Sequence, residues 1–423
     1  MASIAEKFGK HIYRHMNRPE YVRRMLLLAY RFYGLQMHVL PNKLLSPAKQ
    51  YLGTACMDCM IRPLAHPERQ VLTSLFTPCE FISAMGLSPM CAEQYSTYVN
   101  GACAEQGFVE AAEAAGIAET FCSYHKIVTG AVLSGIMPAP RAIVNTSLAC
   151  DANNLTFRKA AEHFDVPQIY IDVPYRTDHD SVMYVAEQLR HAAVQLEDIT
   201  GRKLDEEKLR EAVARSRRTV EISKAILPLR RDHYVSTELT SELYESLMMH
   251  NALGSPEALR YMTMLRDEFE ASTIRPGRKI LWMHSNPFYQ NAAKEIFNYR
   301  TDPWIALTEM YCDSMIDMTS DDPYEAMAER TVFNSYNGPV TRRAQSAVKL
   351  ADMVQPDGII LFCHWGCKET CGASPIIQDA LEAAGYPVLV LNGDGVDRKN
   401  ASDGQTRTRL EAFLEMLGHS QRT

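Results

Sequence analysis

The chain has 423 residues, which is too long for one ordinary hydrophobic core and predicts two or three domains. Its 46% apolar and 22% charged content is typical of a globular protein in water. The 44 basic and 51 acidic residues leave a net charge of −7, which argues against nucleic-acid binding.

The first 65 residues have an amphipathic pattern and are expected to form a helical segment. The polar N-terminus shows no signal-peptide pattern, and the apolar run Met25–Tyr30 is far too short to span a bilayer. We therefore expect a cytoplasmic protein without membrane attachment.

Strand and helix patterns alternate in two stretches, residues 66–177 and 276–423, separated by an almost wholly helical connector, 178–275. The expected strands are 70–76, 141–146, 167–172, 279–283, 358–362 and 387–391. The expected helices include 78–85, much of 104–135, 154–164, one from Pro287, 375–384 and 406–417, with a long polar helical region before strand 358–362. Such alternation predicts an α/β protein with two parallel-sheet lobes.

Three cysteines, Cys363, Cys367 and Cys371, follow or end the strand 358–362. Ser374-Pro375 is a typical helix start, so these cysteines belong to a strand-to-helix loop. Ligands bind at the carboxyl ends of strands in open α/β sheets. Packing alone is a poor explanation for three thiols there.

The same placement recurs upstream, where Cys79 and Cys122 lie at predicted helix starts and Cys150 lies in the loop between the strand 141–146 and the helix 154–164. Backbone N–H groups and the helix dipole favour an anion at such positions, which suits thiolates. Eleven cysteines in a chain with no secretion signal indicate metal or redox chemistry rather than a disulfide framework. Buried hydrophobic roles are expected for Cys91, Cys103 and Cys312, and the lone pair Cys56 and Cys59 is a weak signal.

A second loop, His284-Ser285-Asn286-Pro287, follows the strand 279–283, with Asn286 as the expected helix cap. His284 and Ser285 would face the same edge as Cys367, either as substrate-contacting groups or as part of an ordinary capped helix. Glu80, beside Cys79, is a candidate acid or a partner of the helix dipole.

Three kinds of cysteine chemistry compete. Structural zinc needs four ligands in tight pairs, and a Cys/His nucleophile would not need five further cysteines. An iron–sulfur cluster held by cysteines from several loops accounts for more of them, although the close spacing of ferredoxins is absent.

Four segments resemble the 2-hydroxyacyl-CoA dehydratase / benzoyl-CoA reductase family. They are Phe-Cys-Ser-Tyr-His-Lys at 121–126, Leu-Ala-Cys-Asp at 148–151, His-Trp-Gly-Cys-Lys at 364–368, and the tail from Gly393 to Glu415. The resemblance implies two flavodoxin-like (Rossmann-like) lobes with a [4Fe-4S] cluster between them, held at positions matching Cys122, Cys150 and Cys367. It also implies an ATP-hydrolysing iron–sulfur activator protein as electron donor, in keeping with the lack of a phosphate loop here.

The surplus cysteines, Cys79, Cys363 and Cys371, depart from that pattern. Six thiolates resemble a branch of the family that carries a double-cubane [8Fe-9S] cluster in each subunit of a homodimer and reduces small molecules. On this reading His284, Ser285 or Glu80 would meet the substrate. The alternatives are a dehydratase subunit of a heterodimer, removing water from a 2-hydroxyacyl-CoA through a ketyl radical, and a non-catalytic electron-transfer subunit.

Overall fold

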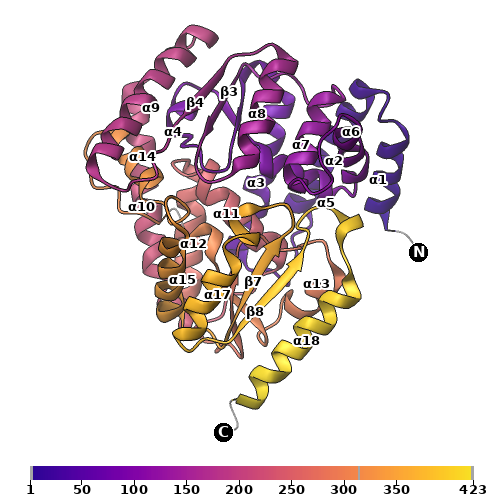
Figure 1. Cartoon of the computed structure of the whole chain (residues 1–423), viewed down its shortest axis with the longest axis vertical. Coiled ribbons are helices and arrows are strands. Elements are labelled where there is room, and N and C mark those ends of the chain that lie inside the picture. Colours follow the sequence, from indigo (N-terminus) through magenta and orange to yellow (C-terminus); the bar gives the residue numbers. More distant parts are fainter. Residues whose placement is uncertain (1–2, 313–314, 421–423) are drawn as a thin grey trace.

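The structure, a computed structural model, describes residues 3–312 and 315–420. It contains two four-stranded parallel sheets flanked by helices, one in each lobe (Figure 1). The prediction of an α/β protein with two flavodoxin-like lobes is therefore confirmed.

Both sheets have the same strand order, with the second strand of each lobe at one edge, then the first, third and fourth. In the first sheet the order is β2-β1-β3-β4, and in the second it is β6-β5-β7-β8. The strands are β1 (Gln70–Thr73), β2 (Ser88–Cys91), β3 (Ala142–Thr146), β4 (Gln168–Ile171), β5 (Lys279–Met283), β6 (Trp304–Thr308), β7 (Gly358–His364) and β8 (Val388–Gly393). In this order the winding direction changes between the first and third strands, which is where ligands bind in doubly wound folds.

Helices pack around these sheets and account for most of the chain. Before the first sheet come α1 (Ile4–Arg14), α2 (Pro19–Val39) and α3 (Pro47–Ala65), and within the first lobe lie α4 (Glu80–Ala84), α5 (Ala92–Gly101), α6 (Glu105–Ala114), α7 (Ser123–Leu133) and α8 (Asp151–Phe164). The connector holds α9 (His179–Thr200), α10 (Glu206–Ile226), α11 (Leu239–Asn251) and α12 (Pro256–Ala271). The rest are α13 (Asn291–Phe297), α14 (Pro323–Val332), α15 (Val340–Val354), α16 (Lys368–Cys371), α17 (Ser374–Ala383) and α18 (Asp403–Ser420).

Two strands and one helix start differ from the sequence predictions. The edge strand β2 was not predicted, because it has only four residues and includes Pro89, which weakens its strand pattern. The strand β6, Trp-Ile-Ala-Leu-Thr, is fully buried, so assigning it to a polar helical region was wrong. Asn286 caps no helix, because α13 begins only at Asn291 with Gln290 before it.

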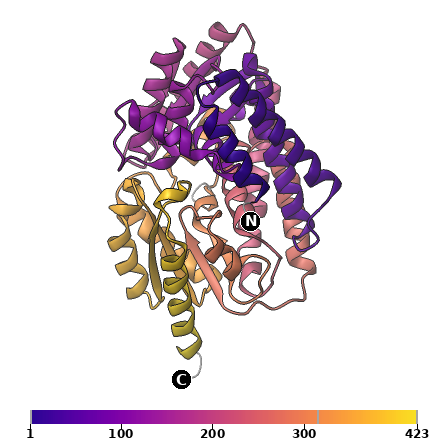
Figure 2. The same cartoon turned by 90° about the vertical axis from the view of Figure 1, so that its right-hand side faces the viewer.

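The chain crosses between the lobes more than once. Helix α14 follows β6 in sequence, yet it packs against α9 beside the first sheet, as the upper part of Figure 1 shows. Its Met327 and Ala328 share one buried cluster with Val71 and Val144 of the first sheet. Figure 2 shows the N-terminal helices against the outside of the upper lobe.

The third strand of each sheet, β3 or β7, is buried along its whole length. All seven residues of β7 are buried, and its neighbours β5 and β8 pair with it in parallel register. Within the described residues, no helix is both long and apolar enough to cross a membrane.

Candidate functional site

A cavity of about 80 Å³ lies where the carboxyl ends of both sheets meet. One buried water needs roughly 10–15 Å³ by the same measure, so the space can hold a larger group. Its apolar wall contains Leu75, Phe76, Leu243, Leu247 and Met310. Its polar groups are Glu93, Thr97, Cys122, Tyr124, His125, Cys150, Ser246, His284, Ser285, Tyr336, His364, Cys367 and Glu369.

Three of the six predicted cysteines line this cavity. Cys122, Cys150 and Cys367 each occupy the N-cap position of a helix, namely α7, α8 and α16. Cys150 follows β3 and Cys367 follows β7, so both lie at the switch points of their sheets. Fold topology, rather than sequence proximity, brings them together.

Burial controls the acidity of these thiols. It raises the pKa of Cys367 to about 11, against small opposing effects from Thr370 and Arg343. It raises the pKa values of Cys122 and Cys150 further, and their neighbouring cysteines add to the increase. Without a metal the three thiols therefore keep their protons at neutral pH, and a bound cation would have to displace them.

Each of the three thiols faces the Nε2 atom of a buried histidine. Cys122 Sγ lies 3.3 Å from His364, Cys150 Sγ lies 3.5 Å from His125, and Cys367 Sγ lies 3.8 Å from His284. Burial lowers the pKa of His125 to about 3 and lowers the pKa values of His284 and His364. At neutral pH all three imidazoles are thus uncharged, with one N–H each.

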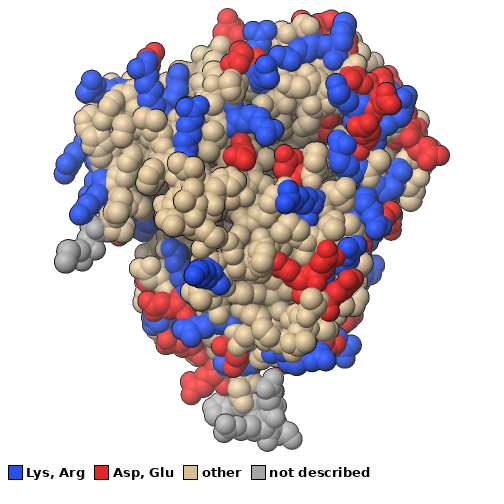
Figure 3. Space-filling model, turned by 180° about the vertical axis from the view of Figure 1, so that it is seen from behind, with Lys and Arg blue, Asp and Glu red and all other residues tan. Residues whose placement is uncertain are grey.

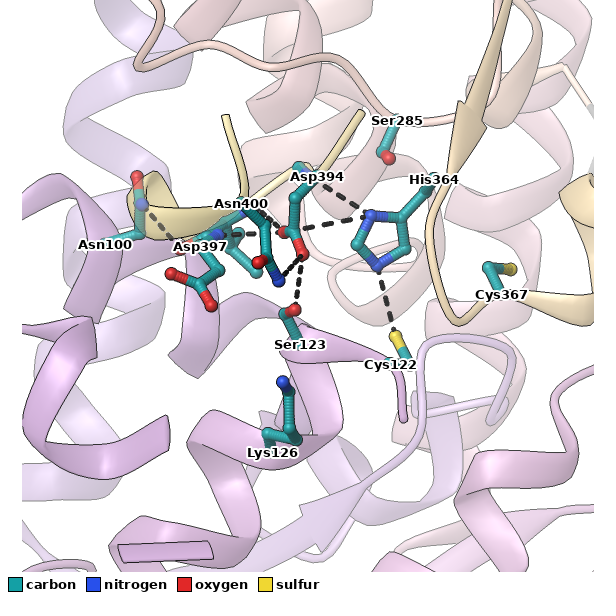
Figure 4. A network of polar contacts seen from close by, with 12 residues as sticks. Asn100, Cys122, Ser123, Lys126, Ser285, His364, Cys367, Asp394, Asp397 and Asn400 are labelled. Carbon is teal, nitrogen blue, oxygen red and sulfur yellow. Dashed lines mark hydrogen bonds and ion pairs between the residues drawn. The ribbon is translucent and has the colours of Figure 1, made fainter. Parts of the chain in front are cut away.

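The loop after β8 holds His364 in place (Figure 4). The Gly395 N–H donates to His364 Nδ1 at 3.0 Å. Asp394 fixes this loop because its carboxylate accepts from Ser123 Oγ at 2.5 Å and from the N–H groups of Val396 and Asp397. A Cβ at Gly395 would lie 2.8 Å from the Tyr124 hydroxyl, so a larger residue there would force the Tyr124 side chain to shift.

The four charged residues Asp394, Asp397, Arg407 and Arg409 give the tail sequence the pattern of a structural ion-pair network, but in the structure their partners lie elsewhere. Arg407 instead pairs with Glu295 and Glu411, and Arg409 donates to a carbonyl of β8. The tail supports His364 rather than forming its own ion-pair cluster.

The loop Trp365–Cys367 joins the lobes directly. Gly366 has φ +77°, and a Cβ there would lie 2.7 Å from Cys122 N and from Thr120 O. Lys368 Nζ lies 2.7 Å from Asp151 in the other lobe, and both side chains are exposed. Trp365 is 44% exposed and does not line the cavity.

Glu309 and Arg343 form a buried ion pair behind the second switch point, with Nε–Oε1 and Nη2–Oε2 distances of 2.7 and 2.8 Å. Glu309 Oε2 also accepts from the backbone N–H of His284, which has φ +70°. Arg343 Nη1 donates to the carbonyl of Glu369, next to the start of α16. The pair therefore positions both His284 and the helix that Cys367 caps.

The structure separates the other predicted site residues from this cavity. Cys79 caps α4 and contacts Thr77 O and Asn251. Glu80 forms a buried ion pair with Arg330 and accepts from Ser216. The remaining two cysteines face each other, with a Sγ–Sγ distance of 3.6 Å between Cys363 and Cys371. None of these four lines the cavity, whereas His284 and Ser285 do.

Sequence reasoning missed several cavity residues. His125 lies three residues after Cys122, a spacing that places both on one side of α7, but its partner Cys150 could not be foreseen. Glu93 and Glu369 belong to no sequence motif that would mark them as site residues. Burial raises the pKa of both carboxyls, so they hold protons to higher pH than exposed carboxyls do.

The arrangement of donors favours a polynuclear group over a single ion. Among residues 3–312 and 315–420, no three Cys, His, Asp or Glu side chains are close enough together to hold one metal ion. The three cysteines are instead distributed around a cavity, and thiolates around such a space are typical ligands of iron–sulfur clusters.

A polar groove of about 430 Å³ adjoins the cavity and shares Tyr336 and Glu369 with it. Asp151, Lys368 and Arg343 also line this groove. It therefore lies between the two lobes at the Lys368–Asp151 ion pair.

Comparison with known proteins gives consistent matches. The family model described as 2-hydroxyglutaryl-CoA dehydratase, D-component, matches residues 74–417. The (R)-phenyllactyl-CoA dehydratase alpha subunit of Clostridium sporogenes is 25% identical over 370 residues, covering 80% of this chain and 87% of that protein. The lactoyl-CoA dehydratase subunit alpha of Anaerotignum propionicum is 21% identical, covering 80% and 88%. A benzoyl-CoA reductase subunit of Thauera aromatica is also 21% identical, covering 74% and 80%.

Proposed function

The chain belongs to the 2-hydroxyglutaryl-CoA dehydratase D-component family of enzymes, and we propose that it is the alpha-type iron–sulfur subunit of a 2-hydroxyacyl-CoA dehydratase. The observation that carries this proposal is the convergence of Cys122, Cys150 and Cys367 from both lobes on one buried cavity. A cluster bound there would supply the low-potential electron that the removal of water requires.

The walls of the cavity exclude water from the reacting centre. Leu243, Leu247 and Met310 cover one side, while Glu369 lies between the cavity and the polar groove. Burial raises the pKa of the Glu369 carboxyl, which makes this group the candidate acid that protonates a departing hydroxyl. Ser285, beside His284, orients the substrate in this proposal.

The polar groove suits the access of a thioester. The exposed Lys368 lies there beside its partner Asp151, and the groove meets the cavity at Tyr336 and Glu369. A 2-hydroxyacyl-CoA would place its acyl end in the cavity and leave the larger, anionic CoA portion in the groove and beyond it.

One observation favours a second candidate, a reductase with a double-cubane [8Fe-9S] cluster. Cys363 precedes His364 in β7 and lies 3.6 Å from Cys371, the last residue of α16, so the two could supply two further thiolates. Such a site would need the side chains around α16 to rearrange, because neither thiol lines the cavity now.

The proposal includes two protein partners. One is an ATP-hydrolysing iron–sulfur activator that delivers the electron. The other is a second subunit, a different chain for a dehydratase and a second copy for the double-cubane reductase. Helix α2 supports such a partner, because Leu28, Phe32, Leu35 and Val39 recur along it and are 57–70% exposed. Figure 3 shows a broad area with few charged side chains on the face it draws.

The test is anaerobic purification followed by iron and sulfide analysis. We expect about four irons per chain for one [4Fe-4S] cluster and about eight for a double cubane. Water removal from a 2-hydroxyacyl-CoA should then require the activator, a reductant, hydrolysable ATP and the second subunit. Protein without iron or sulfide would refute both candidates.

A further inference from the structure

The three Cys–His pairs around the cavity share the same arrangement. Each cysteine belongs to a different loop, and each histidine comes from another element, yet every Nε2 is directed at a different Sγ. Residues on separate elements need not show such a match unless the imidazoles act on the sulfurs.

The proton on His364 can be located from its neighbours. The Gly395 N–H donates to Nδ1, so Nδ1 has no hydrogen of its own in the neutral ring. The hydrogen must then be on Nε2, the atom that lies 3.3 Å from Cys122 Sγ. Asp394 does not compete for it, since its nearer oxygen is 3.9 Å from Nδ1 and both of its oxygens accept other hydrogens.

The other two imidazoles have compatible surroundings. Within the part of the chain that the structure describes, His125 Nδ1 has no hydrogen-bond partner, whereas its Nε2 faces Cys150 Sγ and, at 3.8 Å, Glu93. The Ser285 hydroxyl lies 3.2 Å from His284 Nδ1 and can donate to it, which leaves the Nε2 hydrogen for Cys367.

We propose that His364, His125 and His284 are positioning residues whose Nε2–H groups donate to the three cysteine sulfurs and raise the reduction potential of the group they hold. This inference rests on the proposed function, because it needs the three thiolates to be cluster ligands. Hydrogen bonds to the sulfurs are among the main determinants of iron–sulfur potentials, because they stabilise the additional negative charge of the reduced state. His364 has the largest effect, since its contact is the shortest and its tautomer is set by the backbone.

The test compares two amides at position 364. In His364→Asn, the side-chain oxygen can still accept from Gly395, but the side chain is too short to reach Cys122. In His364→Gln, the longer side chain can place an N–H near Cys122 but not an acceptor near Gly395. His163→Asn, at an exposed position on α8, is the matched control.

The readout is the reduction potential of the iron-loaded proteins, which is measured by titration monitored with electron paramagnetic resonance. In His364→Asn we expect the ratio of reduced to oxidised cluster at a fixed potential to fall about tenfold, as for the loss of one hydrogen bond to a charged acceptor. That corresponds to about 59 mV for one electron. His364→Gln should stay close to the parent, as should His163→Asn. Equal potentials in all four proteins, or equal losses in both variants at position 364, would overturn the inference.

A second measurement needs no variant. The reduced parent protein should show magnetic coupling to exchangeable hydrogens that is replaced by deuterium coupling after transfer to D2O. Its absence would also overturn the inference. A parent protein that binds no iron would instead refute the proposed function itself, so the two failures are distinguishable.

Discussion

Replacing Glu309 by Gln tests whether the ion pair behind the cavity holds the site together. Glu309 and Arg343 are each 2% exposed, and two parallel N–H donations join them. Removing one partner of such a pair leaves the other charge buried and uncompensated, which costs about 3–5 kcal/mol. The same change weakens the acceptor of the His284 backbone N–H, so we expect loss of iron as well as of stability.

The assay is urea denaturation of the anaerobically purified protein together with its iron content. Glu295→Gln is the matched control, because its partner Arg407 and Glu295 itself are 37% and 63% exposed. Breaking that exposed pair should change the free energy of unfolding by less than about 1 kcal/mol and leave iron unchanged. Equal destabilisation of the two variants would refute the reasoning from burial. A stable Glu309→Gln protein with full iron would show that the pair does not position His284.

Three further outcomes follow from the site. Single serine substitutions of Cys122, Cys150 and Cys367, which line the cavity, should abolish stable iron binding. The same substitutions of Cys79, Cys363 and Cys371 should leave the iron content near that of the parent protein. Full iron in any variant of the first set would contradict the ligand assignment. Because burial and the neighbouring thiol raise the pKa of Cys363 to about 11, its thiolate fraction in metal-free protein should increase about tenfold per pH unit from pH 7 to 10. Mass-spectrometric alkylation rates measure this, and a flat profile would contradict it. Gly366→Ala should lose iron because its Cβ would meet the Cys122 backbone, whereas Gly385→Ala, also at positive φ but in open space, should lose stability alone.

Local patterns in the sequence were sufficient to predict the elements that carry the candidate ligands. The helix start at Cys122, the loop position of Cys150 after a strand, and the buried strand before Cys367 depend on a few adjacent residues, so they were predictable. The same holds for the two lobes, because strands that alternate with helices form parallel sheets. The strand β2 escaped notice because four residues with a proline carry little pattern.

Contacts between distant residues decided where the cysteine side chains lie relative to one another. Cys122 and His364 are 242 residues apart, and only the packing of one lobe on the other makes them neighbours. The six predicted ligands look equivalent in sequence because each lies near a helix start. Tertiary structure divides them, since the side chain of Cys79 turns toward Asn251 and Cys363 pairs with Cys371. A helix N-terminus can be recognised from a few neighbouring residues, whereas the space that its cap faces depends on which elements pack across from it.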